Sequence, residues 1–281
     1  MTRSIYEETT ARIIDAMEAS DGSVETPWIR STGRPVNALT ENPYHGVNVV
    51  LLWLIADVAG YSTGEWATYK QWQQLGGQVR KNQKAARIVI FKMVRKSKAD
   101  DDTEDGSEDE DVWPMVRYAF VFNRDQVDGV EKVVSETPPV MLDELERFVK
   151  NTGATVEVRG GRAAYSSSLD LIVMPERELF TGTTTSDSTT SWYAVLLHEL
   201  SHWTGHTSRL NRNLVNRFGD EDYAVEELIA ELGSAFLCAD LGISSVVRKD
   251  HVDYLKNWIK VLKNDSRAFF KAASAAEKAA Q

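Results

Sequence analysis

The sequence predicts an α+β protein of two domains, and three observations lead to that prediction. The chain has 281 residues, about the length of two domains of ordinary size. Residues 1–134 alternate helical and β-branched segments, whereas residues 141–281 give one helix, three short strands and then only helices. Residues 135–140 contain two consecutive prolines, so we expect the linker between the domains there.

Composition excludes several classes of protein. A hydrophobic content of 42% with 26% charged residues is typical of a globular protein. The apolar run at residues 47–59 contains Asp57 and falls short of the roughly 20 residues that a membrane span needs, so we expect no membrane partner. Residues 1–19 include four acidic residues and lack the apolar region of a secretory signal. The single Cys238 cannot form an internal disulfide, which fits a reducing cytoplasm, and we expect it to be a buried, inert thiol.

Three helices are expected near the start of the chain. Apolar residues recur at helical spacing over residues 5–17. A second helix is predicted at residues 49–59, with Asn48 as its N-cap and Gly60 in the left-handed position after it. A third is predicted at residues 65–75, ending at a pair of glycines.

Two β-branched runs follow, at residues 87–94 and 112–122, and we expect them to pair as a hairpin. The connection between them holds nine acidic residues among the twelve from Asp100 to Asp111. Such a run repels itself and has no apolar residues, so residues 98–112 are predicted to be a disordered, solvated loop. The alternative is an internal mimic of a polyanion that competes for a basic surface.

The second half begins with a helix predicted at residues 141–151 and ended by Gly153. Short strands are expected at residues 155–158, 162–165 and 170–174, followed by a Ser/Thr-rich loop at 181–191 and then helices.

The first of these later helices contains the motif His198-Glu199-Leu200-Ser201-His202, a HExxH sequence. Residues four apart lie on one face of a helix, so both imidazoles can bind one Zn²⁺ while Glu199 serves as general base. A catalytic zinc needs a third protein ligand. Position 208 is a serine, which excludes the metzincin pattern, and Gly205 is expected to end the helix before His206.

The next predicted helix supplies a better third ligand. Glu227 and Glu231 are four residues apart on it, so Glu227 is predicted to bind the metal, as in gluzincins, and Glu231 to accept the free N–H of a ligand histidine. Glu226 points about 100° away and fits a solvated face. Tyr223, one turn before Glu227, is a candidate to stabilise an oxyanion, although packing in the core is the more common role of such a tyrosine.

The first domain contains a window without acidic residues between Glu65 and Asp100, and the window holds nine basic residues. Cations neutralise phosphates and flat side chains stack on bases, so this composition suits single-stranded DNA. The alternative is that the aromatic residues belong to the core and the basic residues are simply solvated. The candidate DNA-binding residues are Trp66, Tyr69, Lys70, Trp72, Arg80, Lys81, Lys84 and Arg87.

Several motifs in one order resemble a known family. Residues 27–28, 34–37, 44–48, 66–71 and 76–81 resemble the N-terminal single-stranded-DNA-binding domain of the antirestriction protein ArdC, which also occurs in TraC-type plasmid primases. Residues 198–202 with 223–231 resemble the zincin-like metallopeptidase domain that follows it. The resemblance implies a plasmid-encoded, cytoplasmic bacterial protein that binds single-stranded DNA, and duplex DNA more weakly, and protects incoming DNA from host restriction.

Three functions remain open at this point. The first is an antirestriction factor with a zinc metallopeptidase site, with Mn²⁺ as the alternative metal. The second is a protease similar to SprT-like repair proteases, whose substrate is a restriction enzyme or another DNA-bound protein. The third is a module that only occupies DNA and whose zinc domain is vestigial. Glu199 argues against the third, because a structural metal site needs no general base.

Overall fold

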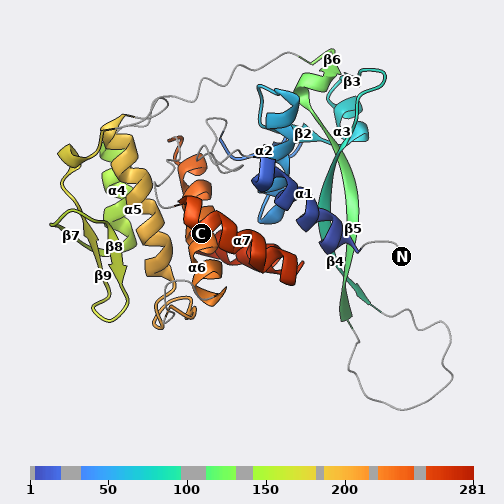
Figure 1. Cartoon of the computed structure of the whole chain (residues 1–281). Coiled ribbons are helices and arrows are strands. Elements are labelled where there is room, and N and C mark those ends of the chain that lie inside the picture. Colours follow the sequence, from blue (N-terminus) through green and yellow to red (C-terminus); the bar gives the residue numbers. More distant parts are fainter. Residues whose placement is uncertain are drawn as a thin grey trace, which may run out of the picture.

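The computed structural model describes residues 4–19, 33–95, 112–130, 142–181, 187–214, 221–243 and 251–281, and within them the predicted α+β class is confirmed (Figure 1). The acidic run and the predicted linker lie outside these ranges. None of the helices in these ranges is long and apolar enough to cross a membrane.

A four-stranded sheet forms the centre of the N-terminal part. Its order is β1-β2-β5-β4, and its main feature is the antiparallel hairpin of β4 (Ala86–Arg95) and β5 (Val112–Asn123), as predicted (Figure 1). The short strands β1 (Val36–Asn37) and β2 (Glu65–Ala67) extend the sheet on the β5 side. A separate two-stranded ladder joins β3 (Gln78–Val79) to β6 (Val127–Asp128), and the 3₁₀ turn η1 (Arg124–Gln126) precedes β6.

Helices α1 (Ile5–Ala19) and α2 (Val47–Ala59) occur where the hydrophobic pattern predicts them. Gly60 adopts the predicted left-handed conformation after α2, with φ 67°. The prediction that Asn48 caps α2 is wrong, because Gly46 is the N-cap residue and Asn48 lies inside the first turn. The Asn48 amide instead pairs with the backbone N–H and C=O of Val89, both at 2.8 Å, and so ties α2 to the edge strand β4.

The third predicted helix is shorter than expected. Residues 65–67 form strand β2, and α3 (Tyr69–Gln74) begins only after Thr68. Thr68 and Gln71 form a capping box in which the Thr68 hydroxyl accepts from the Gln71 N–H at 3.3 Å. Trp66 therefore belongs to a strand and does not share a helix face with Tyr69.

The C-terminal part begins with α4 (Leu142–Thr152) and a three-stranded sheet in the order β7-β9-β8. The strands β7 (Thr155–Val158), β8 (Ala164–Ser166) and β9 (Leu171–Met174) agree with the three predicted strands to within about two residues. After the turn η2 (Arg177–Leu179) come α5 (Ser188–Thr204), α6 (Glu221–Asp240), α7 (His251–Asn264) and α8 (Ala268–Ala280).

Helices α5 and α6 approach closely at Gly233. A Cβ atom at Gly233 would lie 2.7 Å from the Ser201 hydroxyl of α5, which is closer than van der Waals contact allows. Ser201 is fully buried and its hydroxyl donates to the Leu197 carbonyl at 2.9 Å, so it has no free space into which it could move. Glycine at this position therefore sets the short separation that places carboxylates of α6 beside imidazoles of α5.

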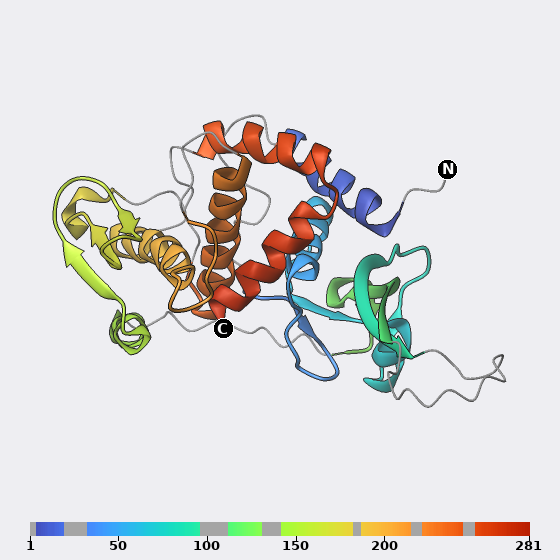
Figure 2. The same cartoon turned by 90° about the horizontal axis from the view of Figure 1, so that it is seen from below.

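The largest hydrophobic core is built from both halves of the chain. It combines residues of α1, α2 and β4 with residues of α6, α7 and α8. Trp53 of α2 and Phe236 of α6, both almost completely buried, have ring centroids 5.9 Å apart. Figure 2 shows α7 and α8 lying against α1 and α2. The predicted division at residues 135–140 remains a prediction, and the two segments on either side of it share one core.

Candidate metal centre

Helix α5 presents His198 and His202 on one face, one turn apart. Their Nε2 atoms lie 3.2 Å apart, and His198 is only 3% exposed. Asp187 caps the helix by accepting from the Thr190 N–H, and Gly205 ends it as predicted. The two imidazoles therefore converge on a single point.

Glu227 of α6 completes a three-residue cluster with the two histidines. Its carboxylate oxygens lie 3.6 Å from His198 Nε2 and 3.5 Å from His202 Nε2, and one ligand atom from each residue falls within 4.8 Å of the others. Burial alone raises the pKa of Glu227, but the hydrogen bond from His198 and the charges of both imidazoles lower it to about 2. Two imidazole nitrogens and one carboxylate, with space beside them, are a donor set that fits a divalent metal at a catalytic site.

Glu199 lies next to this cluster and is 3% exposed. One of its carboxylate oxygens accepts a hydrogen bond from the backbone N–H of Tyr165, in strand β8, at 2.8 Å. That contact fixes the orientation of the carboxylate and places it between the sheet and the histidines. The sequence contains no signal for it, because it depends on how β8 packs on α5.

Each histidine has a carboxylate beside its Nδ1 atom. Glu231 lies 3.4 Å from His198 Nδ1, where the sequence predicts it, and Glu226 lies 3.1 Å from His202 Nδ1. A carboxylate at Nδ1 favours the tautomer whose Nε2 lone pair faces the metal. Glu226 is buried, so the expectation that it lies on a solvated face is wrong.

Arg212 explains why Glu226 can be buried. Its guanidinium donates to both carboxylate oxygens of Glu226 at 2.9 Å, and also to the carbonyl of Ser201 at the end of α5. Burial raises the pKa of Glu226, but the hydrogen bonds from His202 and Arg212 outweigh that effect and leave the pKa below its usual value. Arg212 precedes α6 by a segment outside the described residues, so no helical periodicity could have indicated this role.

A cavity of about 220 Å³ opens beside the cluster, and Glu199, His202, Tyr223 and Glu227 line it together with Tyr165. The Tyr223 side chain is half-buried and hydrogen-bonds to Glu227. His206 lies outside the cluster, with its Nδ1 2.8 Å from the Ser208 hydroxyl. The cavity is large enough for a water molecule and the carbonyl group of a substrate.

Comparison with known proteins agrees with this geometry. Residues 3–122 match the N-terminal domain of anti-restriction factor ArdC, and residues 143–275 match a zincin-like metallopeptidase family. The metal-free crystal structure of antirestriction ArdC protein from plasmid R388 is 37% identical, with a TM-score of 0.79 over 99% of this chain and 96% of that one. The uncharacterized protein y4eC of Sinorhizobium fredii is 38% identical over 98% of this chain and 90% of its own length. The chain belongs to the ArdC antirestriction family.

A second structure of R388 ArdC and two TraC primases extend the ArdC family resemblance. The Mn(II)-bound crystal structure of R388 ArdC has a TM-score of 0.78 and 36% identity, and together with the His, His, Glu set it supports a divalent metal site. Two DNA primases TraC of Escherichia coli are each 34% identical over 98% of this chain. The chain spans only 19% and 26% of the length of those primases.

The aromatic residues predicted to contact DNA in the ArdC-type N-terminal region differ strongly in exposure. Trp66 and Trp72 are 1% and 0% exposed, and the Trp72 indole donates to the Phe122 carbonyl at 2.9 Å. This corrects the expectation that they offer ring faces to bases, because both rings belong to the core. Tyr69 is 42% exposed, and its hydroxyl accepts from the Gln78 side chain at 3.0 Å.

The basic residues predicted to contact DNA also fall into two groups, those with an ion pair and those without one among the described residues. Arg80 is 3.1 Å from Asp128, and Arg87 forms an ion pair with Glu8 of α1. Lys70, Lys81 and Lys84 are exposed and form no ion pair with any residue in the described ranges. We call Tyr69 and these three lysines the α3 surface, because they lie on α3 and on the loop that follows β3.

The contact between Glu226 and His202 predicts that Glu226 increases the affinity of the site for metal. Replacing Glu226 by Gln removes the charge that stabilises the Nδ1–H of His202 and leaves Arg212 without its partner. We expect metal affinity, measured by competition with a chelator, to fall by roughly 10- to 100-fold. Asp222→Asn is the matched control, since it removes one exposed negative charge from the same helix and should leave the affinity within about twofold. Equal affinities in the two variants would contradict this role for Glu226.

Proposed function

We propose that this ArdC-family protein binds single-stranded DNA, protects incoming DNA from host restriction enzymes, and hydrolyses peptide bonds at a Zn²⁺ site formed by His198, His202 and Glu227. The observation that carries the peptidase part is the arrangement of Glu199 beside the three-residue cluster, in a cavity open to a substrate. A buried carboxylate next to the two imidazoles, but outside the donor set, suits a general base.

Each residue of the site has a separate role in the proposed reaction. A divalent metal bound by the three donors supplies Lewis acidity to a substrate carbonyl. Glu199, oriented by the Tyr165 N–H, accepts the proton of the attacking water and later delivers it to the leaving amine. The Tyr223 hydroxyl, at the edge of the same cavity, would turn from Glu227 to donate its proton in a hydrogen bond to the oxygen that gains negative charge.

For the DNA-binding part, we propose the α3 surface as one contact region. It combines an exposed aromatic ring with three cations that have no ion pair among the described residues, a combination that suits single strands. The relatives named DNA primases support a role in handling nucleic acid. Protection of single-stranded and duplex DNA from a nuclease, with and without the protein, tests this function directly.

Substitutions on the α3 surface separate stacking from charge. Tyr69→Ala should weaken binding of a single-stranded oligonucleotide by roughly 1 to 3 kcal/mol with little change in its salt dependence, because a ring face is lost. Tyr69→Phe keeps the ring and is the control. Lys81→Gln and Lys84→Gln should weaken binding and make the salt dependence shallower. Fluorescence anisotropy across a salt series measures both quantities, and equal binding by Tyr69→Ala and Tyr69→Phe would contradict the stacking role.

A second candidate function is supported by the same site. The target of hydrolysis would be a restriction enzyme or another protein bound to DNA, so that DNA binding brings the peptidase site to its substrate. Cleavage of a DNA-bound protein at a rate that rises with the length of the single-stranded DNA would support it. A rate independent of DNA would favour protection by occupancy alone.

A further inference from the structure

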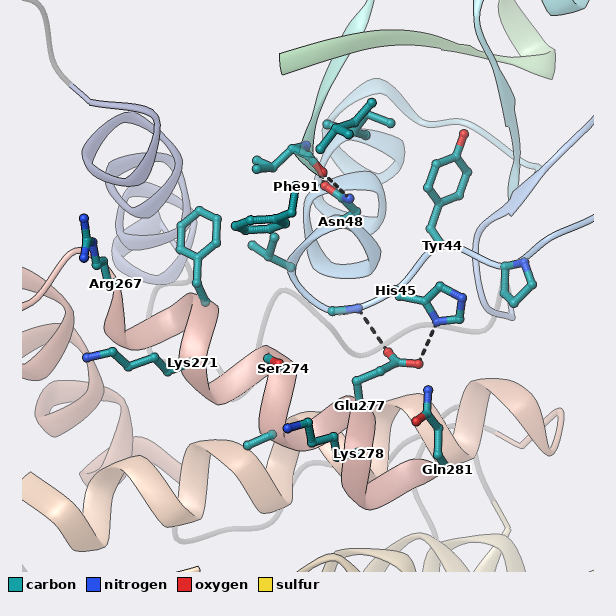
Figure 3. Close-up of a pocket in the computed structure, with 18 of the residues that line it drawn as sticks. Tyr44, His45, Asn48, Phe91, Arg267, Lys271, Ser274, Glu277, Lys278 and Gln281 are labelled. Atoms are coloured by element: carbon teal, nitrogen blue, oxygen red, sulfur yellow. Dashed lines mark hydrogen bonds and ion pairs between the residues drawn. The ribbon is translucent and has the colours of Figure 1, made fainter. Parts of the chain in front are cut away.

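A groove of about 1160 Å³ lies between the N-terminal sheet and helix α8, apart from the catalytic cavity. One wall consists of residues 43–48 and 88–91, from the start of α2 and from strand β4. The opposite wall is α8, and Arg267 lies at one end of it (Figure 3). The groove therefore exists only where the two halves of the chain meet.

One face of α8 presents a row of polar groups to this groove. The row follows the helical spacing of four, three, four and three residues and consists of Arg267, Lys271, Ser274, Lys278 and Gln281. All five are exposed, and Figure 3 shows them succeeding one another along α8. We call this row the α8 stripe.

The charges of the α8 stripe are not explained by the stability of the helix. Arg267 is the N-cap residue of α8, where the helix dipole disfavours a cation. Lys271 lies 3.1 Å from Asp265, an exposed pair, and the charge of Arg267 also acts on that carboxylate. The Arg267 guanidinium lies over the Tyr6 ring. Lys278, in the last turn, is the one member that the dipole favours, and it forms no ion pair with the described residues. The stripe thus carries three cations against one exposed carboxylate, which leaves a net positive charge for an anionic ligand.

The carboxylate that lies in the groove does not cancel this charge. Glu277 is 8% exposed, and it accepts from Arg34 at 2.7 Å. It also accepts from the Gly46 N–H at 3.0 Å and lies 2.8 Å from His45 Nδ1 (Figure 3). Burial raises its pKa, but these hydrogen bonds outweigh that effect and lower it. Its carboxylate is therefore held by donors within the protein, although it shares Arg34 with Asp240, which lies 2.8 Å from that guanidinium.

The wall opposite the stripe offers an aromatic ring. Phe91 is 54% exposed, which is unusual for a phenylalanine, and its ring meets the edge of Phe270 at 6.3 Å. Asn48 holds the backbone of β4 in place two residues earlier, at Val89. A rigid exposed ring facing a row of cations is the combination that binds the bases and phosphates of a single strand.

The groove also leads toward the metal centre. Arg212 lines the groove and a smaller adjoining cavity, and that cavity shares Asn213 and Glu226 with the cavity around Glu199. The adjoining cavity meets the α8 stripe at Lys271, so the middle of a polymer lying along the stripe would face the side of α6 that carries Glu226.

We propose that single-stranded DNA lies in this groove, with its phosphates on Arg267, Lys271 and Lys278 and a base against Phe91. The inference rests on the proposed DNA-binding function and assigns it a site separate from the α3 surface. A polypeptide would also fit a partly apolar groove, but unless it is acidic it has no need of three cations in a row. The charge therefore favours the nucleic acid.

The test compares two triple variants of the full-length protein. Arg267→Gln/Lys271→Gln/Lys278→Gln removes the charge of the stripe, and Arg147→Gln/Lys150→Gln/Arg159→Gln removes the same charge from exposed positions on α4 and after β7. With a fluorescent oligothymidylate, we expect the stripe variant to lose at least about tenfold in affinity, and the slope of log K against log salt to become shallower by about 2. The control should stay within about twofold of wild type.

The other outcomes distinguish a failure of the proposed groove site from a failure of the proposed DNA-binding function. An unchanged affinity in the stripe variant, with a loss in Lys81→Gln/Lys84→Gln, would overturn the groove and leave DNA binding intact. Absence of oligothymidylate binding by the wild type would overturn both the groove site and the proposed DNA-binding function. Slower cleavage of casein by the stripe variant, with unchanged DNA affinity, would show that the groove holds polypeptide and would also overturn the proposal.

Crosslinking gives a second readout that does not depend on affinity. Cys238 is the single cysteine and is buried, so a cysteine introduced at exposed Ser274 can be labelled selectively with a photoreactive group. Ser274→Cys should crosslink to the oligonucleotide, whereas Asn151→Cys on α4 should not. Equal crosslinking at the two positions would contradict a strand in the groove.

Discussion

Replacing Glu227 by Ala is expected to abolish stable metal binding. Glu227 supplies the one oxygen donor of the cluster, and its loss leaves two imidazoles that cannot by themselves complete a catalytic site. The affinity should fall by more than the roughly 10- to 100-fold typical of losing an outer partner of a metal ligand. Elemental analysis after dialysis, followed by titration with Zn²⁺ and Mn²⁺ against a chelator, measures the change and compares the two metals.

His206→Ala is the control for that experiment. His206 is the remaining histidine near the site, and its contacts are with Ser208 and, at 4.0 Å, with Asp170. The variant should retain the metal content of the wild type. Equal metal content in Glu227→Ala and wild type would remove Glu227 from the ligand set, as would a loss of metal confined to His206→Ala.

Replacing Glu199 by Gln is expected to remove hydrolysis while keeping the metal. The amide has nearly the same shape and can still accept the hydrogen bond from the Tyr165 N–H, but it cannot take a proton from water. The rate of peptide hydrolysis should fall by roughly 10²- to 10⁴-fold. Metal content and oligonucleotide affinity should match the wild type.

The same variant separates the candidate functions. If Glu199→Gln still protects DNA from a restriction nuclease, protection follows from binding the DNA, and hydrolysis serves another purpose. If protection is lost together with hydrolysis, the restriction enzyme or another DNA-bound protein is the substrate. Loss of metal from Glu199→Gln would show instead that Glu199 holds the ion, which contradicts its role as general base.

The parts of the site that the sequence could predict are those fixed by one helix. His198, Glu199 and His202 follow from helical spacing alone, and Glu231 follows from its spacing to Glu227. Glu226 could not be placed, because its environment depends on the angle between α5 and α6 and on Arg212, fourteen positions before it. The close approach of α5 and α6 at Gly233 sets that geometry. A single glycine in the sequence of a helix does not indicate that another helix packs closely against it.

The candidate DNA-binding residues illustrate the same limit of sequence-based prediction. A window without acidic residues suggested that Arg87 is free to bind phosphate, yet Glu8 of α1 reaches it from 79 positions away. Their spacing predicts that Trp66 and Trp72 share one exposed helix with Tyr69, but Trp66 lies in a strand and both indoles are buried. The hairpin of β4 and β5 was predictable because alternation and β-branching are local properties.

The shared core of α1, α2, α6, α7 and α8 also makes the protein one thermodynamic unit. Helix α6 carries Glu227 at the metal centre, while Leu228, Leu232 and Phe236 of the same helix belong to that core. An ion that binds only the native state adds about 2.7 kcal/mol to its stability at a hundredfold excess over Kd, and cooperative unfolding distributes this gain over the N-terminal sheet. Metal supply would thereby control how long the N-terminal half survives proteolysis in a cell, even if no peptide bond is ever hydrolysed.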